Sequence, residues 1–442
     1  MRKRVFLNKI EYLFTDEGLY FLSYVVFLSM AILNTTMFSQ YTYRFANLVY
    51  AGCLGLLMFR ELTYGRYSVK TLTLILGGFV LSVLAVLFAH AAVFPMTIVF
   101  IVMAGRIAVR KVLKVALVTT IILCAITILA AEIGLIQNII YYQGVRVRYA
   151  LGFRYVLCLP TYFFNIAAII CYLQKERIKY STLAILTILS TIIFVQTNSR
   201  LTYMTTILLV FFMVYEKLLE RFLPQFKKMN PIWALFIPIF LVISVFSVYI
   251  TICYDPSIGW HNLLNRFLGD RLVISNRSYN IYGIPLLGNS SIEWVGQSVD
   301  VNGIKPSGAI TYVDNLFFNI LQQYGIVTLF AVVILCTIMM YRCYQLGDRI
   351  LMMILVILAL HAFFDGIIQQ LQYNSFLHFI YYLCARYAYM ESERSKEEQE
   401  RRKLLSTGYL NNGLWSRIRK RCLAGAAAYI RRKPADGMIK KE

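Results

Sequence analysis

The segment VALVTTIILCAITILAA, residues 115–131, contains no charged side chain and decides the class of fold. As a helix it would be close to the length that crosses about 30 Å of hydrocarbon. Lys114 precedes the segment and Glu132 follows it. An uncharged run of this length between two charged residues predicts a transmembrane helix.

Similar apolar runs recur along the first 390 residues. The chain of 442 residues is 59% hydrophobic and only 15% charged, a composition that would leave apolar surface in water if it folded as a soluble domain. We therefore predict an all-α, polytopic integral membrane helix bundle in residues 1–390, with about twelve transmembrane helices. The predicted spans are residues 18–37, 45–59, 71–89, 91–105, 115–131, 150–173, 181–196, 201–215, 231–252, 313–340, 350–366 and 374–390.

The distribution of basic residues predicts the orientation. Counted on alternate sides of the spans, 35 Lys and Arg share a side with the N-terminus and 9 lie on the other side, out of 44 in all. This positive-inside pattern puts both termini in the cytoplasm. The net charge of +22 is then mainly a topology signal and does not call for nucleic acid as a partner.

Two segments stand apart from the spans. The predicted outer loop, residues 253–312, is long, but its tryptophans, tyrosines and turn pairs favour an ordered loop with short helices over the mouth of the bundle. Residues 391–442 form a basic cytoplasmic tail that suits an amphipathic helix on an anionic membrane surface. A solvated anchoring tail and a docking segment for a partner are the alternatives.

Arginine dominates the basic residues predicted to lie outside. Arginine grips phosphate with a planar fork of donors, whereas lysine acts as a point charge. Positive charge is disfavoured on the translocated side, so its retention there predicts an anionic substrate such as a lipid-linked phosphate or pyrophosphate. The alternative for any single arginine is a contact with headgroups or with an outer acid. The nine residues are Arg44, Arg146, Arg148, Arg154, Arg200, Arg266, Arg271, Arg277 and Lys305.

Acidic and histidine side chains leave several interpretations open. Asp314 begins a predicted helix, so it is either an N-terminal cap or a catalytic residue. His361 and Asp365, spaced i and i+4, either form an ion or proton site of a transporter or satisfy one another. His261 is a possible base in the outer loop. Cysteine spacing predicts no metal site, and we expect no cofactor.

Several short motifs, in this order, resemble the Wzy-type bacterial polysaccharide polymerases, which share a superfamily with the O-antigen ligases. The family often has a His-Pro-Asn-like sequence after Leu-Gly-Phe, but Arg154 and Tyr155 follow it in this chain. The ligase branch commonly has His-Asn where this chain has Asp-Asn, which favours a polymerase. The matching elements are Arg148 before Leu151-Gly152-Phe153, Ser199-Arg200, Asn276-Arg277 through Tyr282 to Gly288, and Asp314-Asn315 through Tyr324-Gly325.

The resemblance implies a metal-independent membrane glycosyltransferase, similar to the GT-C group in fold. It would join undecaprenyl-pyrophosphate-linked oligosaccharide repeat units into capsular polysaccharide or exopolysaccharide on the outer face of the bacterial cytoplasmic membrane. Membrane lipids, a flippase and a chain-length regulator are the other expected partners. An O-antigen-type ligase and a flippase for the lipid-linked oligosaccharide are the alternatives.

The expected site combines a base with arginines. Asp314 would accept the proton of the acceptor hydroxyl, and fixed arginines would stabilise the leaving pyrophosphate. Catalysis is assigned to Asp314, Arg200 and Arg277. Pyrophosphate binding is assigned to Arg146, Arg148, Arg154, Arg200 and Arg277. Sugar stacking, with loop packing as the alternative, is assigned to Trp260, Tyr279, Tyr282 and Trp294.

Overall fold

The structure is a computed structural model that describes residues 14–65, 69–89, 93–143, 146–222, 229, 231–387 and 390. The chain divides into two compact units, Met1–Tyr387 and Ala388–Glu442. The predicted basic tail, residues 391–442, lies outside the described residues.

Helices make up 74% of the structure. Each of the twelve apolar segments predicted from the sequence contains a helix. These helices are α2 (Asp16–Leu33), α3 (Ser39–Tyr64), α4 (Val69–Ala89), α5 (Val93–Met103), α6 (Val109–Glu132), α7 (Cys158–Gln174), α8 (Tyr180–Thr197), α9 (Arg200–Phe222), α10 (Ile239–Ile252), α13 (Leu316–Leu346), α14 (Arg349–Ala362) and α15 (His378–Ala385).

Among the described residues, seven helical segments are long and apolar enough to cross a membrane, and four further apolar helices are shorter. An all-α chain with these helices is a membrane-embedded protein, as its composition predicted. The count of about twelve crossings remains a prediction. The seven segments are Asp16–Leu33, Ser39–Tyr64, Val109–Glu132, Tyr180–Thr197, Arg200–Leu219, Pro231–Ile252 and Leu316–Leu346.

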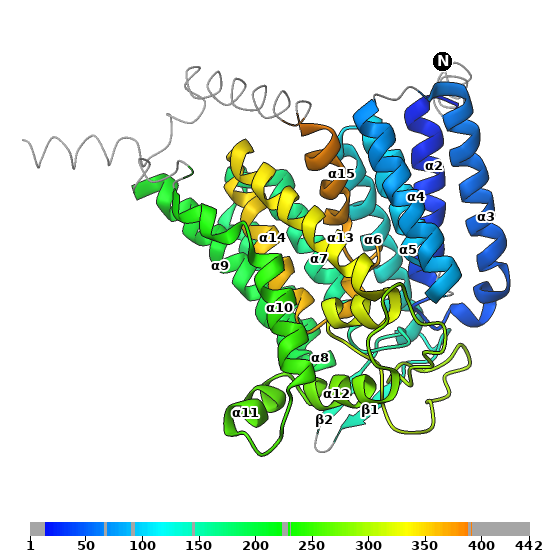
Figure 1. Ribbon diagram of the computed structural model, residues 1–442, viewed down its shortest axis with the longest axis vertical. Coiled ribbons are helices and arrows are strands. Elements are labelled where there is room, and N and C mark those ends of the chain that lie inside the picture. Colours follow the sequence, from blue (N-terminus) through cyan, green and yellow to red (C-terminus); the bar gives the residue numbers. More distant parts are fainter. Residues whose placement is uncertain are drawn as a thin grey trace, which may run out of the picture. The chain divides into compact units, whose positions relative to one another are not determined.

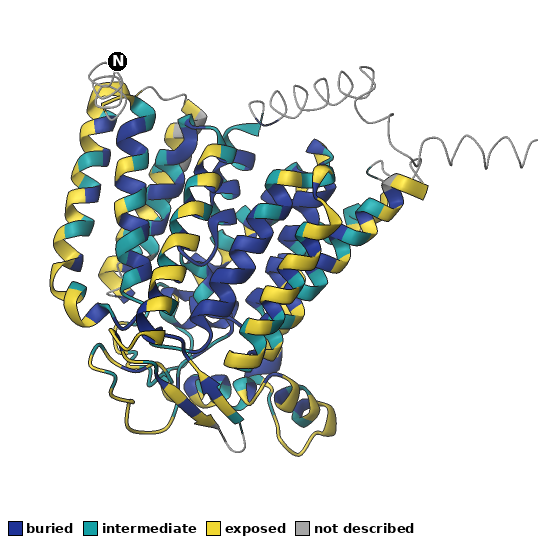
Figure 2. Ribbon diagram, turned by 180° about the vertical axis from the view of Figure 1, so that it is seen from behind, coloured by how far each residue is buried: buried dark blue, intermediate teal, exposed yellow. Residues whose placement is uncertain are grey.

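The outward faces of the helices carry large apolar side chains. Leu48 and Leu62 on α3, Val195 on α8 and Phe330 on α13 are all exposed. Figure 2 shows such exposed positions along the outer helices, with buried residues gathered in the middle of the bundle. An apolar surface of this extent is unstable in water and suits lipid.

The short elements gather at one end of the bundle, which we call the loop-bearing end (Figure 1). Two short helices, α11 (Gly259–Phe267) and α12 (Arg271–Tyr282), lie within the predicted outer loop. Strands β1 (Ile140–Gln143) and β2 (Arg146–Tyr149) pair antiparallel at the same end. Helix α2 begins and helix α15 ends at the opposite end.

Helix α7 begins later than the predicted span at 150–173. Leu151 and Gly152 both adopt positive φ, of 53° and 84°, which no helix accommodates. The Gly152 carbonyl accepts from the Met37 amide at 2.9 Å, and Phe153 pairs with Thr36. The Leu-Gly-Phe element is therefore a tight turn tied to the connection between α2 and α3.

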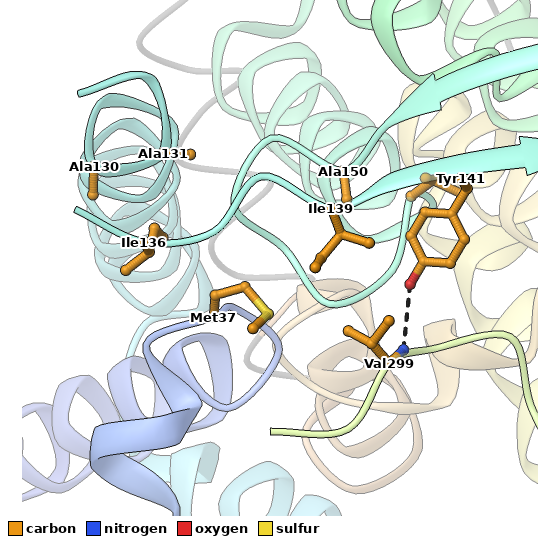
Figure 3. Packing of buried hydrophobic residues seen from close by; sticks show 9 residues of the cluster. Met37, Ala130, Ala131, Ile136, Ile139, Tyr141, Ala150 and Val299 are labelled. Atoms are coloured by element: carbon orange, nitrogen blue, oxygen red, sulfur yellow. Dashed lines mark hydrogen bonds between the residues drawn. The ribbon is translucent and has the colours of Figure 1, made fainter. Parts of the chain in front are cut away.

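An apolar cluster joins this turn to the large loop (Figure 3). Met37, Ile136, Ile139 and Val299 are buried together in it. The Tyr141 hydroxyl accepts from the Val299 amide at 3.3 Å, so the first strand of the hairpin holds the loop against the bundle.

Helix α13 is interrupted at Gly325, whose φ of 87° and ψ of 171° lie in a region open essentially to glycine alone. The amides after the break donate to the large loop: Ile326 to the Pro285 carbonyl at 3.1 Å and Val327 to the Leu286 carbonyl at 3.2 Å. A Cβ on Gly325 would lie 2.5 Å from the Leu286 oxygen. The loop backbone thus fits directly into the break.

Basic residues are paired with acids at the opposite end of the bundle. Arg60 Nε lies 2.8 Å from Asp16 Oδ1, and Arg106 Nη2 lies 2.7 Å from Glu61 Oε1. The Arg60 side chain is fully buried, and it also donates to the Asp16 and Met103 carbonyls. These charges therefore join α2, α3 and the end of α5.

We expect a membrane-impermeant maleimide to label intact cells at Cys253, because this residue is exposed at the end of α10, where the large loop begins. Cys253→Ser should abolish the labelling. Labelling that needs permeabilised cells would reverse the predicted orientation. Cys422, in the predicted cytoplasmic tail, serves as the internal control that reacts only after permeabilisation.

Candidate functional site

Arg148 is held on β2 opposite Tyr141. Its side chain is buried, and it donates from Nε to the Thr197 carbonyl at 2.8 Å and from Nη2 to Ser199 Oγ at 3.3 Å. Burial lowers the pKa of Arg148, and the positive charge of Arg271 acts in the same direction. Arg148 therefore links the hairpin to the turn between α8 and α9 and lies close to a second arginine.

The turn between α8 and α9 displays Arg200. Asn198 ends α8 in the left-handed conformation, with φ of 49° and ψ of 39°, which asparagine tolerates better than most residues. Ser199 is buried against Arg148, whereas Arg200 is exposed. In the part of the chain that the structure describes, no side-chain or backbone group pairs with the Arg200 guanidinium.

Asp314 forms an ion pair with Arg271. Arg271 Nε lies 3.0 Å from Asp314 Oδ2, and the two side chains are 17% and 19% exposed. Asn315 provides the N-terminal cap of α13, accepting from the Phe318 amide at 3.0 Å. Asn315, and not Asp314, therefore caps α13, and Asp314 pairs with Arg271.

A buried asparagine sets the position of Arg271. Asn265 on α11 donates to Asp270 Oδ1 at 3.0 Å and accepts from the Val273 amide at 3.1 Å. Gly269 and Asp270 both have positive φ and turn the chain sharply from α11 into α12. Arg271 then begins α12, with its Nη1 donating to the Leu268 carbonyl at 2.8 Å.

The charges at this end act on one another. Burial raises the pKa of Asp314 to about 6, Arg271 opposes the rise, and Asp365 adds to it. Burial acts to lower the pKa of Arg271, but the Asp314 carboxylate outweighs it and the pKa is raised. Burial also raises the pKa of Tyr155, and the Asp314 charge contributes. We call Arg148, Tyr155, Arg271 and Asp314 the arginine–aspartate cluster.

Arg154 is held by two backbone carbonyls. Its Nε donates to the Val299 carbonyl at 2.9 Å, and its Nη1 donates to the Asn34 carbonyl at 3.2 Å. These contacts tie the large loop to the end of α2. They give Arg154 a scaffold role, and its assignment to pyrophosphate binding remains a prediction.

The other predicted arginines lie nearer the surface. Arg277 is exposed on α12, and its Nη1 donates to the Ile310 carbonyl at 3.2 Å. Arg146 begins β2 and is partly exposed, within electrostatic reach of Arg148. Neither residue contacts Asp314 among the described residues.

Most of the predicted sugar-stacking aromatics pack the loop. Trp294 Nε1 donates to Ser278 Oγ at 2.9 Å, and the Tyr282 hydroxyl donates to the Glu293 carbonyl at 2.9 Å. Tyr279 lies edge-on to Phe318. Trp260 is 50% exposed, so it is the member of the set that keeps a large free surface. The stacking role of all four remains a prediction.

His361, Asp365 and His261, which the sequence marked as candidates, are buried in the fold. His361 Nε2 lies 3.3 Å from Asp365 Oδ2, and their side chains are 0% and 2% exposed. Thr161 also donates to Asp365 Oδ2, at 3.1 Å. His261 Nδ1 accepts from the Asp255 amide at 3.0 Å. These contacts give each group a structural partner.

No family model, curated protein or solved structure matches this chain. Within the described ranges, no three His, Cys, Asp or Glu side chains are placed to hold a metal ion. The resemblance read from short motifs thus stays a prediction, and the geometry of the loop-bearing end carries the functional argument.

Sequence reasoning missed two members of the arginine–aspartate cluster. Arg271 was one of nine outer basic residues with no individual role, and Tyr155 was noted only as a departure from a family motif. The turn from Leu268 to Asp270, with two successive positive φ angles, directs Arg271 toward Asp314. The Gly-Asp pair before Arg271 was the available signal for that turn.

Replacing Arg154 by alanine should loosen the large loop, because two charged hydrogen bonds, each worth about 1.5–3 kcal/mol, are lost. Hydrogen exchange at the Val299 amide should rise, and the melting temperature should fall. Arg200→Ala is the matched control, since it removes an arginine that has no partner in the described residues. Equal exchange in the two variants would contradict the scaffold role.

Proposed function

We propose that the chain polymerises undecaprenyl-pyrophosphate-linked oligosaccharide repeat units on the outer face of the bacterial cytoplasmic membrane. We also propose that the chain crosses the membrane about twelve times, that its fold is similar to the GT-C group, and that both termini lie in the cytoplasm. One observation carries it: at the loop-bearing end of a membrane protein, Asp314 Oδ2 lies 3.0 Å from Arg271 Nε, and Arg148, Arg200 and Arg277 lie at the same end.

The chemistry is a transfer of a glycosyl group. The acceptor hydroxyl attacks the anomeric carbon of the donor sugar, and a new glycosidic bond forms as the bond from that carbon to the pyrophosphate breaks. Asp314 accepts the hydroxyl proton, and undecaprenyl pyrophosphate leaves with the electron pair. At neutral pH a carboxyl group with a pKa near 6 is mostly ionised and still basic enough to assist the attack.

The arginines divide the work of stabilising the leaving group. Arg200 and Arg277 are exposed at the loop-bearing end, so their guanidinium groups are assigned to the pyrophosphate. Arg148 is pinned by Thr197 and Ser199 and contributes a fixed positive charge. A fixed charge stabilises a developing anion without having to reorganise during the reaction.

A deletion of the gene should leave single repeat units on the outer leaflet and no long polymer, as seen by gel and mass spectrometry of lipid-linked and surface glycans. Wild-type protein should restore polymer, whereas Arg200→Ala and Arg277→Ala should insert normally and fail to restore it. Repeat units confined to the cytoplasmic side would indicate a flippase. Long polymer stranded on its lipid carrier would indicate a ligase.

The rate of polymerisation by purified protein in nanodiscs should fall about tenfold per pH unit below pH 6. The folded pKa of Asp314 is raised to about 6, so the base is ionised above that pH and is lost by protonation below it. Asp314→Asn should abolish activity at all pH values. Asp300→Asn is the matched control, because an amide oxygen can still accept from the Asn302 amide that Asp300 binds at 2.9 Å. Full activity of Asp314→Asn would contradict the assignment.

A further inference from the structure

The proposed base is not free in this structure. Arg271 Nε lies 3.0 Å from Asp314 Oδ2, and a carboxylate neutralised by a guanidinium is a poorer proton acceptor than a free one. The pair also remains accessible, since its side chains are 17% and 19% exposed, whereas the His361–Asp365 pair is sealed at 0% and 2%. An ion or headgroup from outside can therefore reach the first pair and not the second.

We propose that Arg271 exchanges anionic partners: the pyrophosphate of the lipid-linked donor draws Arg271 from Asp314, and Asp314 becomes free to accept the proton of the acceptor hydroxyl. This inference rests on the proposed function and adds the order in which its steps occur. The donor binds first, and the base is released as a result.

The geometry of the ion pair favours exchange. Arg271 Nε is buried and lies 3.0 Å from Asp314 Oδ2. Arg271 is also fixed at one nitrogen, because Nη1 donates to the Leu268 carbonyl at 2.8 Å. The guanidinium is thus anchored to the protein on one side and paired with an exchangeable carboxylate on the other, and a phosphate group, which can accept from a guanidinium in a bidentate way, can replace that carboxylate.

The charges around Arg271 favour a ligand with more negative charge than a single carboxylate. Burial and, after it, the charge of Arg271 lower the pKa of Arg148, which has its own fixed partners in Thr197 and Ser199. Arg271 is also the first residue of the 12-residue helix α12, whose N-terminal end carries partial positive charge. Arg271 and the N-terminal end of α12 bring positive charge to Asp314, so a pyrophosphate, with more negative charge than a single carboxylate, competes well for Arg271.

The test measures binding of undecaprenyl pyrophosphate to the full-length protein in nanodiscs, with no acceptor and no turnover. Exchange means that Asp314 competes with the ligand for Arg271. Asp314→Asn should therefore tighten binding by roughly tenfold, a coupling of ordinary size between linked sites. Arg271→Ala should weaken binding by at least as much. Asp300→Asn is the matched control and should change affinity less than about twofold, because Asp300 accepts from the Asn302 and Ile304 amides of its own turn.

The double variant Arg271→Ala/Asp314→Asn separates exchange from simple charge repulsion. If Asp314 acts through Arg271, the gain from Asp314→Asn disappears when Arg271 is absent. A gain that persists in the double variant, or no gain in the single variant, overturns the exchange and leaves the proposed function standing. Wild-type protein that binds no undecaprenyl pyrophosphate would overturn both.

Discussion

The hydrogen bonds between the large loop and the break in α13 are the interaction on which the rest of the loop-bearing end depends. A break in a helix leaves amide groups without intrahelical partners, and these need partners elsewhere when they are buried. Here the carbonyls of Pro285 and Leu286 accept from the amides after Gly325, and the Asn289 amide donates to the Gln323 carbonyl. The backbone groups at the break therefore fix the position of the loop, and the loop supplies the hydrogen-bond partners that the broken helix lacks.

The packing of the large loop against the break in α13 also positions the charged residues. Gln322, one turn before the break, exchanges hydrogen bonds with Ser278 on α12. Helix α12 begins at Arg271, and α13 is preceded by Asp314, so fixing these two helices to each other brings the ion pair together. The apolar cluster around Met37 and Val299 holds the other side of the loop. The arginine–aspartate cluster thus depends on backbone contacts some distance from its charges.

Charged residues serve different purposes at the two ends of the bundle. At the end where α2 begins, Arg60 and Arg106 are joined to Asp16 and Glu61, and Arg60 is fully buried, so these pairs fasten helices together. At the loop-bearing end, the Asp314–Arg271 pair joins the segment before α13 to the start of α12. A network of charges between helix ends contributes to the fold, whereas a single pair beside the large loop can respond to a ligand.

The sequence by itself determined the membrane class and the approximate positions of the apolar helices. The thickness of the hydrocarbon layer sets the length of a membrane-crossing helix, and such a helix is visible in the sequence as an uninterrupted apolar run. It also singled out Asp314 and the arginine-rich outer segments, since the chemistry of a side chain can be read from its type.

Only the tertiary structure decided which arginine meets Asp314. Arg271 and Arg277 lie six residues apart on one helix, so they point to different sides, and the motif that singled out Arg277 does not show which of the two meets Asp314. The same holds for Arg154, whose partners Val299 and Asn34 are 145 and 120 residues away along the chain. Contacts over such separations are set by how the loop packs, a property of the folded backbone that residue type and spacing do not encode locally.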